Sequence, residues 1–347
     1  MDDSRFRLLQ LPQNAFFNVL RSMHTVEVVL LSLISKKAAV RVKSLNIKCD
    51  DSEVQIRSRT ITLEMYIFDK TTDFVDFKFI YPRSHQCDVD QPHLAKIYIS
   101  EYHQGHPPVK HRVSRQFGSL PFWMDHLKFL FNFSKVDAIW LSESQFDLQS
   151  IFRTFPSPDF LSIKNGVYLE DSRELLETIP ITNNFSIEND ICEESKFPDQ
   201  VLFGNYDELF IEDTNDLVPF LKLDDILQTN GKYIEVRYLA LSEKELNRLL
   251  KLWSRGAWSR LEKMELFTVM APREPNKDVI FKGMKYQNFP LEHEQKHVIS
   301  SGTTDLVVGG FGIFRKDGTR ATVTLSQEEE ILEFSLFVWH PHCIGET

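Results

Sequence analysis

The chain of 347 residues lacks the features of a secreted or membrane-spanning protein. Residues Met1 to Arg5 contain no basic stretch followed by an apolar run, so we expect no signal peptide. The apolar stretch from Val26 to Ile34 is too short to cross a bilayer, which takes about 20 residues. With only 13 Gly and 15 Pro and no low-complexity tract, the composition is that of an ordinary globular protein.

Cysteine is scarce as well. The four cysteines are scattered, without the paired spacing of a disulfide framework or a metal site, and they are Cys49, Cys87, Cys192 and Cys343. This distribution favours reduced thiols. We therefore expect a cytoplasmic or nuclear protein. We also predict that it needs no cofactor and does not associate with a membrane.

Two common enzyme motifs are also missing, the G-x-S-x-G nucleophile turn and the P-loop lysine. The glycine-rich stretch from Val307 to Gly312 is followed by a second strand-like run and an Asp-Gly turn. A phosphate site needs a helix N-terminus after its glycines. We therefore interpret these glycines as a bend in a sheet.

One segment does match a catalytic pattern. His293-Glu-Gln-Lys-His297 fits H-E-x-x-H, in which two His one helical turn apart bind zinc and the Glu acts as general base. Pro290 before it and charged Lys296 within it disfavour such a helix, so a polar surface turn is the preferred interpretation and a zinc peptidase the alternative. A second set of potential metal ligands is His85, Cys87, His93, His103, His106 and His111. Their spacing does not close a tetrahedral site, so we predict no metal there.

Charge is unevenly distributed along the chain. Residues 165–225 hold sixteen acidic and three basic residues, a net charge of −13. Residues 1–48 hold eight bases and three acids, and residues 226–285 hold twelve bases and seven acids, a net charge of +5 in each case. An acidic middle beside basic flanks argues against a basic groove for nucleic acid. It leaves open a basic protein partner or a solvated acidic face.

The first 45 residues predict two short helices that are apolar on nearly every side. Pro12 suits the first position of a helix, where its missing N–H needs no partner. Phe16, Val19, Leu20 and Met23 then recur at helical spacing, and a second helix is expected to begin near Thr25. Two such helices cannot bury this much apolar surface against each other, so they must cover a core or bind a partner.

This segment resembles an F-box, the helical module that binds a Skp-family adaptor in cullin-based ubiquitin ligases. Leu11-Pro12 stands at the family's Leu-Pro, Val19-Leu20 at its Ile-Leu, and Leu33 to Lys37 at its Leu-Val-Ser-Lys-Arg. Ala15, His24-Thr25 and Ala38 depart from the family's usual Val, Asp-Pro and Trp. The resemblance implies an adaptor-binding set of Leu11, Pro12, Phe16, Val19, Leu20, Val29, Leu33 and Ile34.

The middle of the chain predicts repeated strand–helix units. Six short β-like runs have centres near residues 139, 162, 186, 210, 235 and 265, which are about 23, 24, 24, 25 and 30 residues apart. Helix-like runs lie between them, at 146–155, 172–179, 219–229 and 242–253. Such a period favours an α/β solenoid similar to leucine-rich repeats, with a doubly wound α/β sheet as the alternative.

The flanks of this region predict antiparallel strands, which we expect to cap the ends of the solenoid. Residues 54–81 alternate between apolar and polar, and Gly312 to Leu325 has the pattern of a hairpin with Asp317-Gly318 at its turn. The stretches Asp225 to Glu262, Arg315 to Thr322 and Phe337 to Trp339 resemble the F-box-associated (type 2) domain of a large nematode F-box family.

Together these features predict an F-box at 1–45, a β-rich connecting region at 46–112 and a repeat-like F-box-associated domain at 113–347. The resemblance implies a non-catalytic substrate receptor of an SCF-type ubiquitin ligase, with a Skp-family adaptor, a cullin and an unidentified target protein as partners. The alternative is a repeat scaffold that binds proteins without ubiquitination. Trp258, in a loop-like segment beside Arg260, is a candidate for contact with the target, because interfaces favour Trp and Arg. Trp253 lies on an apolar helical face, so we expect it to be buried.

Overall fold

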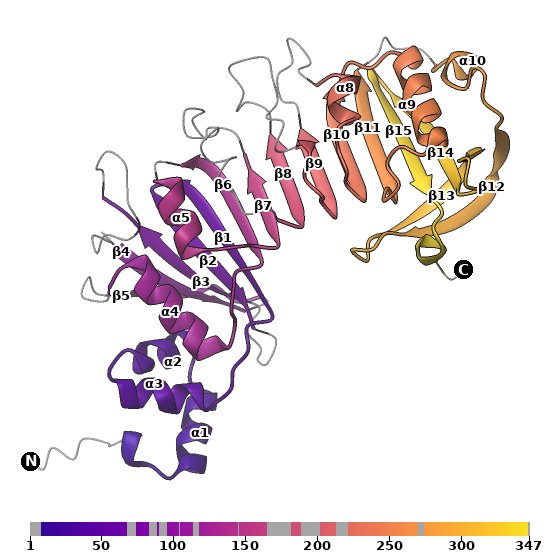
Figure 1. Cartoon of the computed structure of the whole chain (residues 1–347). Helices are drawn as coiled ribbons and strands as arrows, with labels where there is room; N and C mark the ends of the chain where they lie inside the picture. The colour runs from indigo at the N-terminus through magenta and orange to yellow at the C-terminus, as the bar shows by residue number, and fades with distance from the viewer. Residues whose placement is uncertain are drawn as a thin grey trace, which may run out of the picture. The chain divides into compact units, whose positions relative to one another are not determined.

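The computed structural model describes the greater part of the chain: residues 8–67, 74–82, 89, 96–103, 105–113, 118–144, 146–164, 182–188, 202–212, 221–269 and 274–345. These residues form two compact units, Met1–Asp159 (unit 1) and Phe160–Thr347 (unit 2), each of which mixes helices with a sheet (Figure 1). In the part of the chain that the structure describes, no helix is both long and apolar enough to cross a membrane.

Unit 1 begins with a group of short helices, which we call the helical module. It consists of η1 (Leu8–Gln10), α1 (Gln13–Ser22), α2 (Thr25–Ser32) and α3 (Lys36–Lys43). The two predicted helices are present, with α2 beginning at Thr25 as expected, while Pro12 lies one residue before α1. The third helix was not predicted. It forms because the Ser35 side chain accepts a hydrogen bond from the Ala38 N–H at 3.1 Å and so caps a new helix.

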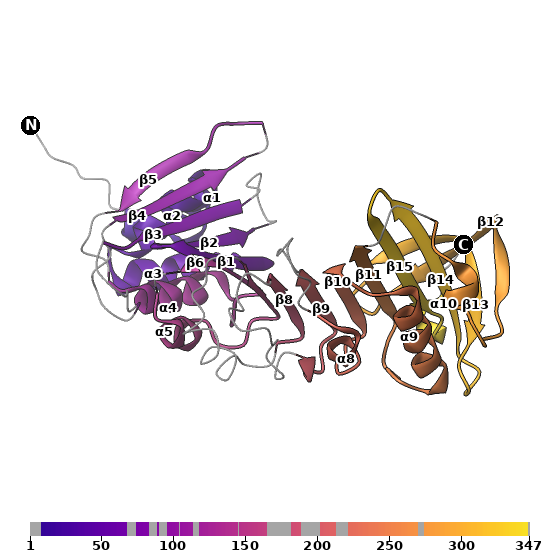
Figure 2. The same ribbon diagram turned by 90° about the horizontal axis from the view of Figure 1, so that it is seen from above.

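The rest of unit 1 is a mixed sheet covered by two helices. Its strand order is β6-β1-β2-β3-β4-β5, antiparallel from β1 to β5, with β6 parallel to β1. Helices α4 and α5 lie against one face (Figures 1 and 2), where Trp123 of α4 contacts Phe77 and Phe79 of β3. The elements are β1 (Asp51–Ser58), β2 (Thr60–Tyr66), β3 (Phe74–Ile80), β4 (Lys96–Tyr102), β5 (Val109–Val113), α4 (Leu120–Phe131), β6 (Ala138–Ser144) and α5 (Leu148–Thr154).

Unit 2 begins with five parallel strands in constant register. The paired residues Phe160, Asn184, Glu208, Tyr233 and Lys263 are 24, 24, 25 and 30 residues apart, which confirms the predicted spacing. This register places apolar side chains of neighbouring strands in two continuous buried rows. One row is Leu161, Phe185, Leu209, Ile234 and Met264, and the other is Ile163, Ile187, Ile211, Val236 and Leu266. The strands are β7 (Phe160–Ile163), β8 (Asn184–Glu188), β9 (Glu208–Glu212), β10 (Tyr233–Leu239) and β11 (Lys263–Val269).

The helices described in unit 2 are α8 (Leu223–Ile226), α9 (Glu243–Arg255) and α10 (Lys277–Ile280). Helix α9 is close to the predicted 242–253: Ser242 caps its first turn, and Gly256, with a φ of 114°, ends it. Its apolar face, including Trp253, is fully buried, as predicted. The predicted helix at 172–179 lies outside the described residues, and of the predicted 219–229 the structure describes residues 221–229, which contain α8.

Four antiparallel strands complete unit 2: β12 (Gln287–Val298), β13 (Thr304–Phe314), β14 (Arg320–Glu328) and β15 (Ile331–Val338), followed by η3 (Pro341–Cys343). The predicted hairpin is present as β13–β14, with Gly318 at a φ of 89° in its turn. Strand β15 pairs directly with β11. These strands therefore extend the parallel ladder within its own sheet, and do not form a separate cap over it. Unit 2 therefore has a mixed sheet with helices, and the structure does not show the predicted solenoid as such.

The buried face of α9 gives a test of the fold of unit 2. Replacing Leu250, which is fully buried, by Ala leaves a cavity and should lower the free energy of unfolding by about 2–5 kcal/mol. Urea unfolding followed by tryptophan fluorescence measures this change. Lys244→Ala, on the exposed face of the same helix, is the control and should shift the midpoint little. Equal midpoints for the two variants would contradict the orientation of α9.

Candidate docking module and target cleft

The helical module is held together by a small core and by one arginine. Phe16, Leu20 and Val29 are fully buried. Arg41 of α3 donates hydrogen bonds to the carbonyl oxygens of Leu9 at 2.7 Å and Leu11 at 3.0 Å. Its guanidinium also lies over the Phe16 ring, 4.6 Å from the centroid. A single side chain thus ties the start of the module to its last helix.

The predicted adaptor-binding residues divide into three groups by exposure. Phe16, Leu20 and Val29 are buried within the chain, so they contribute to a docking surface only by holding the helices in place. The half-buried residues are Leu11, Val19 and Leu33, and the exposed ones are Pro12 and Ile34. Ile34 is 70 % exposed, which is unusual for a large apolar side chain.

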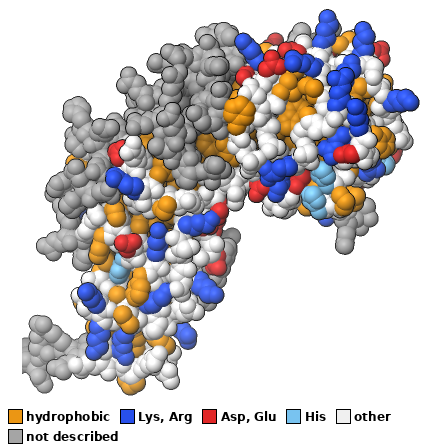
Figure 3. All heavy atoms as spheres, in the orientation of Figure 1, with side chains coloured by type: hydrophobic (Ala, Val, Ile, Leu, Met, Phe, Trp, Pro, Cys, Tyr) orange, Lys and Arg blue, Asp and Glu red, His pale blue; other side chains and the backbone are white. Residues whose placement is uncertain are grey.

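The sequence analysis missed one residue of this kind, Val40 of α3, which is 60 % exposed. Ala38 and Val42, two residues to either side, are buried and define the inner face of the helix. Val40 lies outside this buried stripe, and its position between Ala38 and Val42 is the feature of the sequence that could have identified it as exposed. In Figure 3 the lower part of unit 1, which contains α1, α2 and α3, shows hydrophobic side chains among Lys and Arg side chains.

The module is joined to the remainder of unit 1 by specific polar contacts. The Ser32 hydroxyl of α2 lies 2.7 Å from Nε2 of His126 on α4. The Asn132 side chain, which follows α4, donates to Asn46 at 2.8 Å and accepts a hydrogen bond from Lys43. Removal of the module would therefore also disrupt contacts that α4 makes, so point substitutions test its role more cleanly than a deletion.

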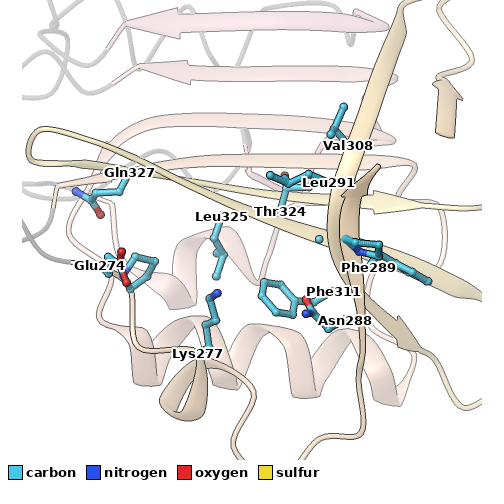
Figure 4. A pocket seen from close by; sticks show the side chains of 13 residues that line it. Glu274, Lys277, Asn288, Phe289, Leu291, Val308, Phe311, Thr324, Leu325 and Gln327 are labelled. Carbon is cyan, nitrogen blue, oxygen red and sulfur yellow. The ribbon is translucent and has the colours of Figure 1, made fainter. Parts of the chain in front are cut away.

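Unit 2 contains a cleft of about 570 Å³ between α10 and the strands β12, β13 and β14 (Figure 4). Its lining combines apolar side chains with polar ones, among them the oppositely charged Glu274 and Lys277. Lys277 Nζ lies 5.2 Å from the centroid of the Phe311 ring. The lining residues are Glu274, Pro275, Lys277, Asn288, Phe289, Pro290, Leu291, Val308, Gly310, Phe311, Thr324, Leu325 and Gln327.

A bend in the hairpin β12–β13 shapes this cleft. The register shifts between Phe289 and Glu294, so the residues between them bulge out opposite Gly309. Gly309 and Gly310 have φ values of 62° and 100°, and a Cβ on Gly310 would lie 2.6 Å from the Val323 carbonyl oxygen. Only glycine fits there. The predicted interpretation of Val307 to Gly312 as a bend is confirmed, and the bend leaves Leu291 76 % exposed at the cleft.

The zinc-peptidase alternative does not fit the structure. His293 and His297 lie on strand β12, and not on a helix. Four residues along a strand span about 13 Å, too far for two His to bind one ion. His297 is fully buried and its Nε2 donates to the Val338 carbonyl oxygen at 3.1 Å. Burial lowers the pKa of His297, which favours the neutral form of its ring.

The expectation that Trp258 is an exposed contact residue is wrong. Its side chain is only 7 % exposed and belongs to the core of unit 2. The local sequence Gly-Ala-Trp-Ser looked like a loop, but the Leu261 N–H donates to the Trp258 carbonyl oxygen at 3.1 Å, which forms a tight turn that folds the ring inward. Trp258 is therefore not a candidate for target contact.

Other potential ligands are placed as follows. His85, Cys87 and His93 lie outside the described residues, whereas His103 lies close to Glu101 and His24. Cys49 and Cys343 are free thiols, and burial raises the pKa of Cys49 to about 12 and that of Cys343 to about 11. Neither is therefore a ready nucleophile at neutral pH.

A buried carboxylate that the sequence did not indicate holds the end of the chain. Glu262 is 3 % exposed and accepts hydrogen bonds from the Ser300 N–H at 2.6 Å and from the Ser300 hydroxyl. Nε2 of His342 lies 3.0 Å from the same carboxylate. Burial acts to raise the pKa of Glu262, but the bonds from Ser300 and His342 outweigh it and hold the pKa below its usual value.

Comparison with known proteins gives one match. A family model described as F-box associated matches residues 197–266, a stretch that includes β9, β10 and α9. Asp225 to Glu262 lie within this stretch, so their resemblance to an F-box-associated domain is confirmed. The match does not reach the helical module, for which the F-box resemblance stays a prediction. No curated protein and no solved structure matches the chain.

The Glu262 contacts generate a prediction about pH. A carboxyl whose pKa is lowered in the folded state adds stability above its unfolded pKa of about 4.3, and this stability is lost as the pH falls through the folded value. Ser300→Ala removes one donor and should lower the free energy of unfolding by about 1.5 kcal/mol at pH 7. The difference from the parent should shrink below about pH 4.

Urea unfolding at pH 7 and at pH 3.5 measures this effect, with Ser301→Ala as the control because Ser301 is exposed beside it. A difference between parent and Ser300→Ala that stays the same at both values would rule out the proposed role of the Glu262 charge.

Proposed function

We propose that the chain is the non-catalytic substrate-recognition subunit of an SCF-type cullin ubiquitin ligase. The observation that carries this proposal is the match of residues 197–266 to the F-box-associated family. It supports an F-box assignment for the helical module of the same chain, which presents Ile34 and Val40 to solvent. The module would bind a Skp-family adaptor and, through it, a cullin, in the cytoplasm or the nucleus.

In this proposal the chain itself carries out no bond chemistry. It would bind a target protein near the conjugating enzyme that the cullin recruits, which raises the local concentration of target lysines. The predicted division into 1–45, 46–112 and 113–347 remains part of the proposal. So does the description of β7 to β11 as a leucine-rich-repeat-like solenoid, which the constant register supports.

The cleft of unit 2 is the proposed site for the target. The apolar part of its lining would take an apolar side chain of the target, while Glu274 and Lys277 would pair with charges on either side of it. A few side chains that are buried in such pockets supply most of the affinity of protein interfaces. Figure 4 shows Lys277, Leu325 and Phe311, which come from three different elements, gathered in one part of the cleft.

The adaptor prediction is best tested at Ile34. Ile34→Asp should leave the fold intact, since the side chain is 70 % exposed. A charge in a desolvated interface should cost about 2 kcal/mol or more, which weakens binding of a purified Skp-family adaptor about 30-fold. Calorimetric titration measures the affinity. This variant is cleaner than Leu11→Ala with Pro12→Ala, because the Leu11 carbonyl oxygen also accepts a bond from Arg41.

The matched control is Phe314→Asp, the same kind of change at a side chain that is 59 % exposed in unit 2, and it should bind the adaptor like the parent. Unchanged binding by Ile34→Asp would argue against the surface assigned here. If the parent itself fails to bind the adaptor, the alternative holds, a scaffold that binds proteins without ubiquitination.

A separate prediction concerns the cleft. Leu325 is half-buried in its lining, and Leu325→Arg should fill the cleft with a charged side chain and abolish target binding while adaptor binding stays intact. Proteins bound to the parent and to the variant in cells are compared by quantitative mass spectrometry. Leu306→Arg is the control, since Leu306 is 62 % exposed and does not line the cleft. An identical set of bound proteins for Leu325→Arg and its control would exclude the cleft.

A further inference from the structure

Two imidazoles and a carboxylate come together where α2 meets β4 in unit 1. His24 directly precedes α2, Glu101 lies in β4, and His103 follows that strand. One ligand atom from each residue lies within 4.8 Å of the others. His24 Nδ1 is 3.8 Å from Glu101 Oε2, and His103 Nε2 is 3.4 Å from Glu101 Oε1.

Glu101 stands where the strand pattern calls for an apolar residue. Side chains of a strand alternate between its two faces, so Ile97, Ile99 and Glu101 share one face. Both isoleucines are buried, and Glu101 is also only 1 % exposed. Burying a carboxylate costs several kcal/mol unless charges or hydrogen bonds compensate it. A cation beside this carboxylate, together with the local hydrogen bonds, would supply that compensation.

Part of this compensation is provided by the helix. The Val26 N–H, in the first turn of α2, donates to Glu101 Oε2 at 3.2 Å. This bond fixes the orientation of the carboxylate and leaves Oε1 directed toward His103. Metal sites commonly hold a ligating carboxylate in place with such a bond from outside the ligand set.

The spacing suits a tetrahedral ion. Zinc binds imidazole nitrogen and carboxylate oxygen at about 2.0–2.2 Å, so two of its ligand atoms lie about 3.3 Å apart. His103 Nε2 and Glu101 Oε1 are already 3.4 Å apart, and the three ligand atoms all lie within 4.8 Å of one another, so small side-chain movements bring them to that value. The His24 side chain is 47 % exposed, which gives an ion access from solvent and room for a water as fourth ligand.

We propose that His24, Glu101 and His103 form a binding site for one zinc ion, which fastens the helical module to the sheet of unit 1. The three residues supply two nitrogen ligands and one oxygen ligand, a set that zinc accepts. The site is independent of the proposed function, since it needs neither an adaptor nor a target.

A second cluster, Glu262 with His342 and Cys343, also brings potential ligand atoms within 4.8 Å of one another. There the carboxylate accepts two bonds from Ser300 and lies 3.0 Å from His342. This cluster is therefore the competing metal site that the test must distinguish from the first.

The experiment uses the full chain, stripped of metal with a chelator and titrated with zinc chloride in a calorimeter. We expect one zinc per chain and a higher thermal midpoint when zinc is present. His103→Ala and Glu101→Gln should each weaken zinc binding at least tenfold and remove the thermal shift. Glu101→Gln retains an oxygen that can accept the hydrogen bond from the Val26 N–H. This variant should therefore stay folded even if His103→Ala does not fold.

Two controls make the test specific. His106→Ala, an exposed histidine three residues from His103, and His342→Ala in the second cluster should both leave zinc binding unchanged. Titration with cobalt(II) should give the visible absorption of a tetrahedral ion in the parent and not in Glu101→Gln. The proposal is overturned if the parent binds no zinc, if zinc binding survives both His103→Ala and Glu101→Gln, or if it is lost in His342→Ala.

Discussion

The constant register of the parallel strands is the constraint on which unit 2 depends. The shortest strands, β7, β8 and β9, have only two or three apolar residues each, too few to bury a surface alone. The register that pairs Phe160 with Asn184, and Asn184 with Glu208, aligns the apolar residues of neighbouring strands. They therefore form two continuous rows across five strands. A one-residue slip in any pair would turn a row toward solvent. The near-constant spacing along the sequence follows from this requirement.

The helical module shows how one short segment divides its apolar residues between two tasks. Phe16, Leu20 and Val29 are enclosed within the chain, whereas Ile34 and Val40 face solvent. Sequence periodicity alone cannot separate Ile34 from Phe16, Leu20 and Val29, because all four are apolar and recur at helical spacing. The structure separates the residues that hold the helices together from the exposed residues that would form the proposed docking surface, and variants of the two groups should therefore fail for different reasons.

Local patterns in the sequence predicted much of the fold. Strand alternation, the helical run at 242–253, Asp317-Gly318 and the strand spacing each correspond to an element found in the structure. The sequence did not predict α3, because this helix begins after a capping serine, Ser35, that lies within a segment predicted to hold only two helices. Trp258 was misjudged because burial depends on a turn formed with Leu261 and on packing partners far away in the chain.

Contacts between distant residues were also beyond sequence reasoning. Glu101 and His24 are 77 positions apart, and Glu262 and His342 are 80 positions apart, so no short motif links them. The two clusters share a common form, a buried carboxylate between a backbone N–H and a histidine. Each fastens a terminal segment, the helical module in one case and the end of the chain in the other.

Strand β12, the last in the order of unit 2, has a further consequence for how a target is recognised. Pro290 has no N–H to offer, the bulge after Phe289 interrupts the strand, and Glu292 and Glu294 place charges along it. This edge is therefore a poor template for an incoming strand. Recognition would rely on side chains entering the cleft and not on main-chain pairing, so a folded target with one protruding apolar residue suits it as well as an extended peptide does.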